Sequence, residues 1–143
     1  MSADNKALVR RYVEEVLNRK NLALIDQLVA PTFIAHDSSM PDAKGPAGVK
    51  QLAAMVHASF PDLHFTVEDM VAEGDKVVYR YTVRGTHQGD FMGIPPTGRQ
   101  FAVTGIHIYR VGDGKFQEEW ENWDMLGLMR QLGVLPQPGP GKK

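Results

Sequence analysis

The residues best suited to acid–base chemistry lie on either side of a glycine-rich turn near the end of the chain. His107 precedes this turn, and Glu119 and Glu121 follow it. The flanking segments favour β-strands, and the Gly-Asp-Gly sequence at 112–114 favours a hairpin between them. A histidine beside a carboxylate on a pocket wall is suited to proton transfer. Partial burial would raise the carboxyl pKa from about 4 towards neutrality, as a general base requires.

The register of this hairpin decides which carboxylate accompanies His107. A three-residue loop over 112–114 pairs His107 with Glu119 and places Glu121 on the same face. A two-residue loop shifts the register by one, and His107 then shares its face with Asp124. Solvated charges on a sheet face, or an ion pair at a subunit interface, are the alternative interpretations, because structural pairs also perturb pKa values.

The other histidines carry weaker signals. His36 ends a short predicted strand where the mouth of a pocket is expected, so we predict that it contacts a ligand. We expect His57, His64 and His87 to be structural or exposed. No pair shows zinc-helix or His-x-His spacing, which argues against a metal site. No glycine-rich loop leads from a strand into a helix, which argues against nucleotide binding.

Composition narrows the class of protein. The chain has 143 residues and a formal net charge of −1, with acids and bases alternating, which argues against a nucleic-acid partner. It contains no cysteine, which excludes disulfides and fits the cytosol. Residues 1–11 lack the apolar core of a secretory signal, and every apolar stretch is well short of the ~20 residues of a membrane span. We therefore expect a cytoplasmic protein without a membrane partner.

Helical periodicity dominates the first sixty residues. Apolar residues recur at helical spacing over 4–18, 21–29 and 46–59, which predicts three helices. A short strand over 32–36 and a loop over 37–45, rich in Ser, Pro, Asp and Gly, are predicted between the second and third helices.

The period then changes to two, which is typical of strands. Strands are predicted over 64–72, 76–87, 99–111 and 115–123. A loop over 89–98, which we expect to close over the pocket, and a short helix over 125–132 complete the pattern. This order predicts one α+β domain over 1–135, a cone in which N-terminal helices pack on a curved antiparallel sheet, with a mouth for a small molecule. Residues 136–143 are predicted to be a disordered tail.

The second half of the chain also carries a long series of motif residues. Its most specific part is Gly85-x-His87-x-Gly89-x-Phe91-x-Gly93-x-Pro95-Pro96-Thr97-x-Arg99-x-Phe101. The series continues through His107, Arg110, 113–115, Asp124, Gly127 and 130–133. With this series the chain resembles the SnoaL-like polyketide (ester) cyclases of the nuclear transport factor 2-like superfamily. The resemblance covers nearly the whole length, up to Gly133.

The resemblance implies a cystatin-like α+β barrel, self-association as a homodimer or homotetramer, and no metal or cofactor. It also implies an intramolecular aldol condensation on a polyketide ester, in which a carboxylate removes the proton α to a carbonyl and a histidine assists. His107 occupies the histidine position. Glu121 occupies the acid/base position, where the cyclases have Asp, and Gly105 stands where they have a polar amide. These departures bear on substrate choice, since a base that is misplaced by about 1 Å can lower the rate ~100-fold.

Three functional hypotheses follow. The first is a cofactor-independent enzyme, with Glu121 as base and His107 as partner, acting on a polyketide-like or other small hydrophobic carbonyl compound. The second is a non-catalytic binding protein of the same fold, and the third a ketosteroid isomerase-like isomerase or a hydrolase. In each case we expect the ligand to contact Tyr12, Leu17, Phe33, His36, Phe91, Met92, Trp123 and Asp124.

Overall fold

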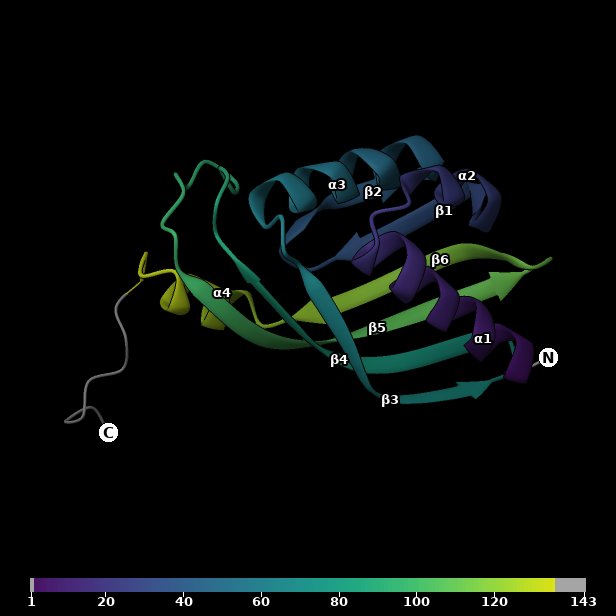
Figure 1. Cartoon of the computed structure of the whole chain (residues 1–143). Coiled ribbons are helices and arrows are strands. Elements are labelled where there is room, and N and C mark those ends of the chain that lie inside the picture. Colours follow the sequence, from purple (N-terminus) through teal and green to yellow (C-terminus); the bar gives the residue numbers. More distant parts are fainter. Residues whose placement is uncertain (1, 136–143) are drawn as a thin grey trace.

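A curved six-stranded sheet with helices across one face forms the frame of the protein, as a computed structural model shows (Figure 1). The elements are α1 (Ser2–Tyr12), the π-helix η1 (Val13–Asn18), the 3₁₀-helix η2 (Leu22–Leu24), α2 (Ile25–Leu28), β1 (Val29–Asp37), β2 (Met40–Lys44), α3 (Gly45–Ser59), β3 (His64–Glu73), β4 (Lys76–Thr86), β5 (Gln100–Gly112), β6 (Lys115–Trp123) and α4 (Met125–Gln131). The structure describes residues 2–135, so the predicted tail over 136–143 lies outside the described residues. The sheet order is β2-β1-β6-β5-β4-β3, which confirms the predicted α+β class.

The N-terminal helix changes its hydrogen-bond pattern halfway. The helix predicted over 4–18 is α-helical through α1 and π-helical through η1. π-helical turns are rare and are frequently found at functional sites. Tyr12, at the end of α1, and Leu17, within η1, both reach the cavity described below. The next predicted helix, over 21–29, is shorter than expected, because the chain is already extended in β1 from Val29.

The segment predicted as a loop over 37–45 contains a strand, so that prediction is wrong in part. β2 pairs antiparallel with β1, with Ala35 opposite Ala43. β2 is an edge strand, where proline is tolerated because its missing N–H faces solvent rather than a partner strand. Pro41 and the polar residues around it gave this strand the composition of a loop.

The sheet is not purely antiparallel, which corrects the predicted strand arrangement. β1 runs parallel to β6, with Ala35 beside Glu119 and Asp37 beside Glu121, whereas the other pairings are antiparallel. Most of the chain separates β1 from β6, so no hairpin fixes their relative direction. The parallel pairing brings Asp37 to the predicted catalytic residues.

The β5–β6 hairpin has neither of the two predicted registers. Asp113 and Gly114 have positive φ angles of 55° and 71° and form a two-residue turn closed by Gly112 opposite Lys115. A bulge then adds Gln117 to β6, because Val111 is opposite Phe116 whereas Arg110 is opposite Glu118.

Turn and bulge together place His107 directly opposite Glu121. The two-residue turn alone would place His107 opposite Trp120. The bulge moves the pairing by one further residue, to Glu121. His107, Glu119 and Glu121 therefore share one face, as the three-residue loop predicts. Trp120 lies opposite Ile108 on the other face.

Burial distinguishes the two faces of the sheet. Along β4 and β5 every second residue is buried, and the residues between them are exposed or half-buried. The buried face carries aromatic rings, of which Tyr109 and Phe116 pack against Tyr12 of α1 and Tyr79 stacks on Tyr109. None of the helices within residues 2–135 is long and apolar enough to cross a membrane.

Candidate active site

A cavity opens between the buried face of the sheet and the helices α1 and α3. Its wall is mostly aliphatic and aromatic, with residues from α3 on one side and from β4, β5 and β6 on the other. The polar side chains in this wall are few: Asp37, His57, Tyr81, His107, Glu119 and Glu121, together with the phenols of Tyr12 and Tyr109 and the indole of Trp123. An apolar pocket with a few convergent polar groups is the usual form of a small-molecule site.

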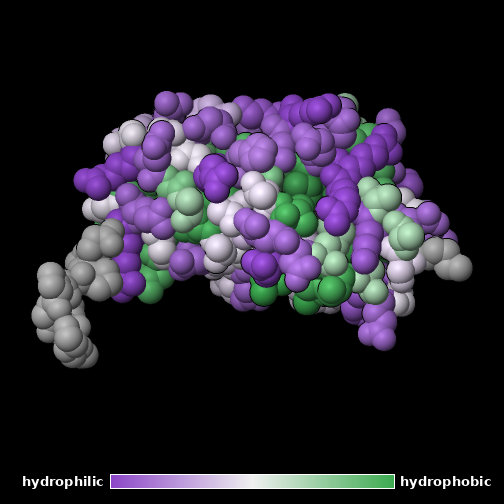
Figure 2. Space-filling view, turned by 60° about the horizontal axis from the view of Figure 1, so that its bottom comes forward, coloured by the Kyte–Doolittle hydropathy of each residue, from purple (hydrophilic) through white to green (hydrophobic). Residues whose placement is uncertain are grey.

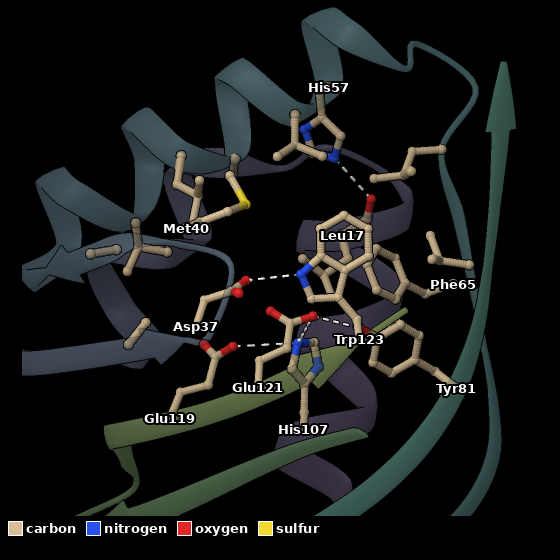
Figure 3. Close-up of a pocket in the computed structure, with 18 of the residues that line it drawn as sticks. Leu17, Asp37, Met40, His57, Phe65, Tyr81, His107, Glu119, Glu121 and Trp123 are labelled. Atoms are coloured by element: carbon tan, nitrogen blue, oxygen red, sulfur yellow. Dashed lines mark hydrogen bonds and ion pairs between the residues drawn. The ribbon is translucent and has the colours of Figure 1, made fainter. Parts of the chain in front are cut away.

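His107 lies at the centre of the polar groups (Figure 3). Its ring is 3% exposed, and its Nε2 atom is 2.7 Å from Oε2 of Glu121 and 3.3 Å from Oε2 of Glu119. The other ring nitrogen, Nδ1, is 2.5 Å from the hydroxyl of Tyr79. Both nitrogens are therefore engaged, which fixes the orientation of the imidazole.

Glu121 accepts two hydrogen bonds on one carboxylate oxygen. Oε2 accepts from His107 and from the hydroxyl of Tyr81. No hydrogen bond to Oε1 is formed within residues 2–135, and the side chain is 18% exposed on the cavity wall. The free oxygen is therefore available to a ligand in the cavity.

Burial and charge set different protonation states in this cluster. Burial would raise the pKa of Glu121, but the His107 charge and the hydrogen bonds from His107 and Tyr81 lower it below its usual range. Burial would lower the pKa of His107, but the two glutamates more than offset this and raise it. For Glu119, burial and the charges of Glu121 and Asp37 outweigh His107 and raise the pKa to about 7.

Asp37 is a third carboxylate at the cavity, which the sequence did not reveal. Its Oδ2 accepts a hydrogen bond from the indole Nε1 of Trp123 at 3.1 Å, and its Oδ1 accepts from the backbone and hydroxyl of Ser39, both at 2.8 Å. The parallel pairing of β1 and β6 places it beside Glu121. No sequence pattern predicts this pairing, since the two strands are far apart in the chain.

Tyr81 occupies the space that a side chain at position 105 would need. A Cβ atom on Gly105 would overlap the hydroxyl of Tyr81 and come within 2.8 Å of Cβ of Trp123. The polar amide that the resemblance to the cyclases implies at this position has no room here. Instead, a tyrosine hydroxyl from the neighbouring strand donates to Glu121, so the site keeps a polar donor close to position 105. The alternation of Tyr79, Tyr81 and Val83 in β4 was a signal for this inward-facing tyrosine.

Four of the predicted ligand contacts lie in the cavity wall, namely Tyr12, Leu17, Phe91 and Trp123. The other four do not. His36 lies on the opposite face of β1 from Ala35 and Asp37, because neighbours along a strand alternate. It stacks on Trp120 and bonds Glu118 at 2.8 Å.

The other three residues, Phe33, Met92 and Asp124, also lie outside the cavity wall, each for a reason in its own surroundings. Phe33 is 2% exposed and packs in the core rather than in the cavity wall. Met92 is 48% exposed in the loop between β4 and β5. Asp124 caps α4, where its Oδ1 accepts the backbone N–H of Gly127 at 2.8 Å.

The histidines predicted to be structural or exposed divide into two groups. His87 is buried and accepts a hydrogen bond from the backbone N–H of Thr97 at 3.2 Å, and His64 is exposed. His57, however, also lines the cavity, where its Nε2 donates to the carbonyl of Leu17 at 3.0 Å. Burial lowers its pKa, so the ring is favoured in its neutral form.

The cluster also has the residue types of a cation site. One ligand atom from each of His107, Glu119 and Glu121 lies within 4.8 Å of the other two. The short contact between His107 Nε2 and Glu121 Oε2 is a hydrogen bond, however, and an ion at this position would have to replace its proton. The arrangement therefore suits proton transfer better than metal ligation.

Comparisons with known proteins agree with the fold and the site. The family model described as SnoaL-like polyketide cyclase matches residues 7–132, so the chain belongs to this family. The aklanonic acid methyl ester cyclase of Streptomyces peucetius is 30% identical over 138 residues, covering 93% of this chain and 92% of the relative. The nogalonic acid methyl ester cyclase of Streptomyces nogalater is 36% identical over 90 residues, covering 62% and 67%.

Solved structures extend the likeness to three dimensions. TsrD of Streptomyces laurentii has a TM-score of 0.83 and 32% identity, covering 93% of this chain and 97% of its own. AclR of Streptomyces galilaeus, described as a candidate hydroxylase, has a TM-score of 0.86 and 33% identity, covering 98% and 87%. The protein is thus an enzyme of the polyketide cyclase type, with a curved sheet and N-terminal helices like those of its neighbours.

Proposed function

We propose that the protein closes a ring in a small hydrophobic polyketide ester by an intramolecular aldol addition, with Glu121 as the base. The observation that carries this proposal is the environment of Glu121. The resemblance to the cyclases implies that it is the acid/base residue, its side chain lines the cavity, and hydrogen bonds from His107 and Tyr81 favour its ionised form.

As a base, Glu121 is suited to removing a proton from an acidic C–H bond of the substrate. A carboxylate whose pKa lies below its usual range is a weak base, so it needs a substrate whose carbanion is strongly delocalised. A carbon between two carbonyl groups provides this, because the enolate spreads over both oxygens. The carbanion then attacks a second carbonyl of the same molecule, forming a carbon–carbon bond, and the resulting alkoxide takes up a proton.

The charges of the wall favour a substrate whose own carboxyl group is esterified. Three carboxyl groups, Asp37, Glu119 and Glu121, line the cavity, and no lysine or arginine of the described chain does. A free carboxylate in this cavity would lose its hydration and meet charges of its own sign. A methyl ester avoids both penalties, which agrees with the methyl ester substrates in the names of the relatives.

The proposal is tested with the compounds that these names contain. Purified protein is incubated with aklanonic acid methyl ester or nogalonic acid methyl ester. The product is separated by chromatography, and its molecular mass is measured by mass spectrometry. We expect an isomer of unchanged mass with one additional ring, because an aldol addition moves protons without losing atoms. Recovery of both compounds unchanged would contradict the proposal for these substrates, and tight binding without conversion would favour a binding protein.

Hydroxylation by molecular oxygen, with the substrate or an added reductant supplying the two electrons, is the second candidate because of the likeness to AclR. The same experiment separates the two reactions, because hydroxylation adds the mass of one oxygen atom whereas cyclisation leaves the mass unchanged.

We also propose that the chain self-associates through the outer face of its sheet. On this face Val71 is 58% exposed and Ile106 is 47% exposed. Figure 2, which views the molecule from one side, shows that apolar patches do occur among the polar side chains of its surface. Self-association would cover such apolar area. Light scattering should give at least twice the chain mass for the wild type and a smaller mass for Ile106→Lys; a monomeric wild type would refute this.

A cytoplasmic location is proposed from the absence of cysteine, which fits a reducing compartment. Fractionation of the producing cells tests it, and recovery of the protein outside the cytoplasm would contradict it.

A further inference from the structure

Two glutamates share one nitrogen of His107. Nε2 lies 2.7 Å from Glu121 and 3.3 Å from Glu119, and both carboxyl groups line the same cavity. They are two residues apart on β6 and project from the same face. The proposed aldol reaction uses one of them as a base, so the second has no assigned role.

The surroundings of Glu119 disfavour a second negative charge. Its side chain is 14% exposed. Asp37 approaches from β1, Glu121 stands on the same strand, and Tyr12 of α1 and Tyr109 of β5 complete the wall, with His107 as the nearby group that can carry positive charge. When two carboxyl groups share a site, one is favoured ionised and the other protonated. Glu121 accepts hydrogen bonds from His107 and Tyr81 and is favoured in the ionised form. For Glu119 a hydrogen bond from Tyr109 and the charge of His107 act in the same direction, but burial and the two neighbouring carboxylates outweigh them, which leaves the proton on Glu119.

We propose that Glu119 is a second catalytic residue, whose protonated carboxyl group donates to the carbonyl oxygen that becomes the hydroxyl of the new ring. This rests on the proposed cyclase function and assigns its acid. The arrangement explains why the wall has two glutamates where removal of the α proton needs only one. Pairs of titratable groups whose environments push their pKa values apart are typical of acid and base partners.

The protons balance through His107. Glu121 takes the α proton of the substrate, the resulting carbanion attacks the second carbonyl, and Glu119 gives its proton to the oxygen of that carbonyl. Glu121 is then neutral and Glu119 ionised. Nε2–H of the imidazolium passes its proton to Glu119, and the vacated nitrogen takes the proton from Glu121, which restores the starting state. His107 can do this because Nε2 is the atom that contacts both carboxyl groups.

The protonation of Glu119 can be measured without any substrate. The full chain is labelled with ¹³C at the glutamate side-chain carboxyl carbons and titrated by NMR between pH 4 and 9. We expect one resonance to titrate near neutral pH and to be missing from Glu119→Gln. A Glu119 carboxyl that is ionised throughout the range above pH 5 would overturn the proposal, whatever the substrate of the enzyme.

A second experiment separates the base from the acid. With the methyl esters named above in D₂O, deuterium uptake at the α carbon reports on Glu121, whereas ring closure requires both groups. Glu119→Gln keeps the size of the side chain but cannot transfer a proton. It should slow ring closure about 100-fold while deuterium uptake stays within a few-fold of the wild type. Ring closure at the wild-type rate would overturn the proposal.

Glu118→Gln is the matched control. Glu118 is the neighbour of Glu119 on the outer face of β6, where it bonds His36 and Arg110. The same chemical change there should leave both rates unaltered. If the wild type converts neither ester, the proposed function fails for them, and the NMR titration still decides whether Glu119 holds its proton.

Discussion

His107 and Glu121 stand directly opposite each other on β5 and β6, with Nε2 and Oε2 2.7 Å apart. The pairing depends on a two-residue turn followed by a bulge, which together align the two side chains. Each partner favours the charged form of the other, so the pKa of Glu121 is lowered and that of His107 is raised. The pair therefore holds an ionised base inside an apolar cavity at neutral pH.

The hydroxyl of Tyr81 should tune the base. Its hydrogen bond stabilises the ionised form of Glu121 and contributes to the low pKa of that carboxyl. Tyr81→Phe should raise this pKa, so the fall of kcat/KM at acid pH should move to higher pH. A pH profile of kcat/KM for both proteins checks this. An unchanged acid limb would show that Tyr81 does not set the protonation of the base.

Glu119 should make stability depend on pH. Its pKa is about 7 in the folded protein against an ordinary value of 4.5, so between these pH values the folded chain holds a proton that the unfolded chain has released. The free energy of unfolding therefore loses a contribution as pH rises from about 5 to 8. This loss is absent from Glu119→Gln. As pH rises over that range, the free energy of unfolding of the variant should therefore increase by roughly 1–3 kcal/mol relative to that of the wild type.

Urea unfolding at pH 5 and pH 8 measures this difference. Glu118→Gln is again the control, because the pKa of Glu118 lies below its usual range and the group is ionised in both states at these pH values. An equal response of the two variants to pH would contradict the assignment of the proton to Glu119.

Gly105 should not tolerate a side chain. A Cβ atom there would overlap the hydroxyl of Tyr81 and crowd Trp123, and overpacking of this kind costs about 1–3 kcal/mol. Gly105→Ala should lower the free energy of unfolding by that amount and displace Tyr81 from Glu121. Gly112→Ala is the comparison, since its Cβ would meet the flexible side chain of Gln117 at 3.2 Å. Equal losses from the two variants would argue against the close packing at Gly105.

Asp124 should matter for stability rather than for binding. It caps α4 through the backbone N–H of Gly127, and loss of such a cap costs about 1 kcal/mol. Asp124→Ala should lower the melting temperature and leave KM unchanged. A rise in KM without a loss of stability would instead support the prediction from the sequence that Asp124 contacts the ligand.

The sequence predicted the parts of the structure that local patterns control. β6 was predicted over 115–123 and is found there, and β3, β4 and β5 differ from their predicted bounds by only a residue at either end. Their alternation of apolar and polar residues is strong, and glycine-rich turns separate them. The shared face of Glu119 and Glu121 followed from the same alternation, whereas the face of His107 depended on the turn, for which the sequence left two registers open.

The parts that could not be predicted depend on contacts between distant segments. Nothing in the composition of 37–45 reveals that β2 pairs with β1, or that β1 runs parallel to β6. His36 lies outside the cavity wall because the side of β1 that faces the cavity depends on this pairing. Gln117 forms a bulge that no residue type in the hairpin demands. Asp37 and Tyr81 could be assigned to the site only after these pairings were known.

The most direct test of the account is the rate of ring closure by Glu121→Gln on aklanonic acid methyl ester, measured beside the wild type and Glu121→Asp. Gln keeps the shape of the side chain and cannot accept the α proton. We expect a loss of at least about 100-fold for Glu121→Gln, while Glu121→Asp, which has the residue type that the resemblance to the cyclases implies at this position, retains measurable activity. Ring closure by Glu121→Gln at the wild-type rate would contradict the assignment of Glu121 as the base.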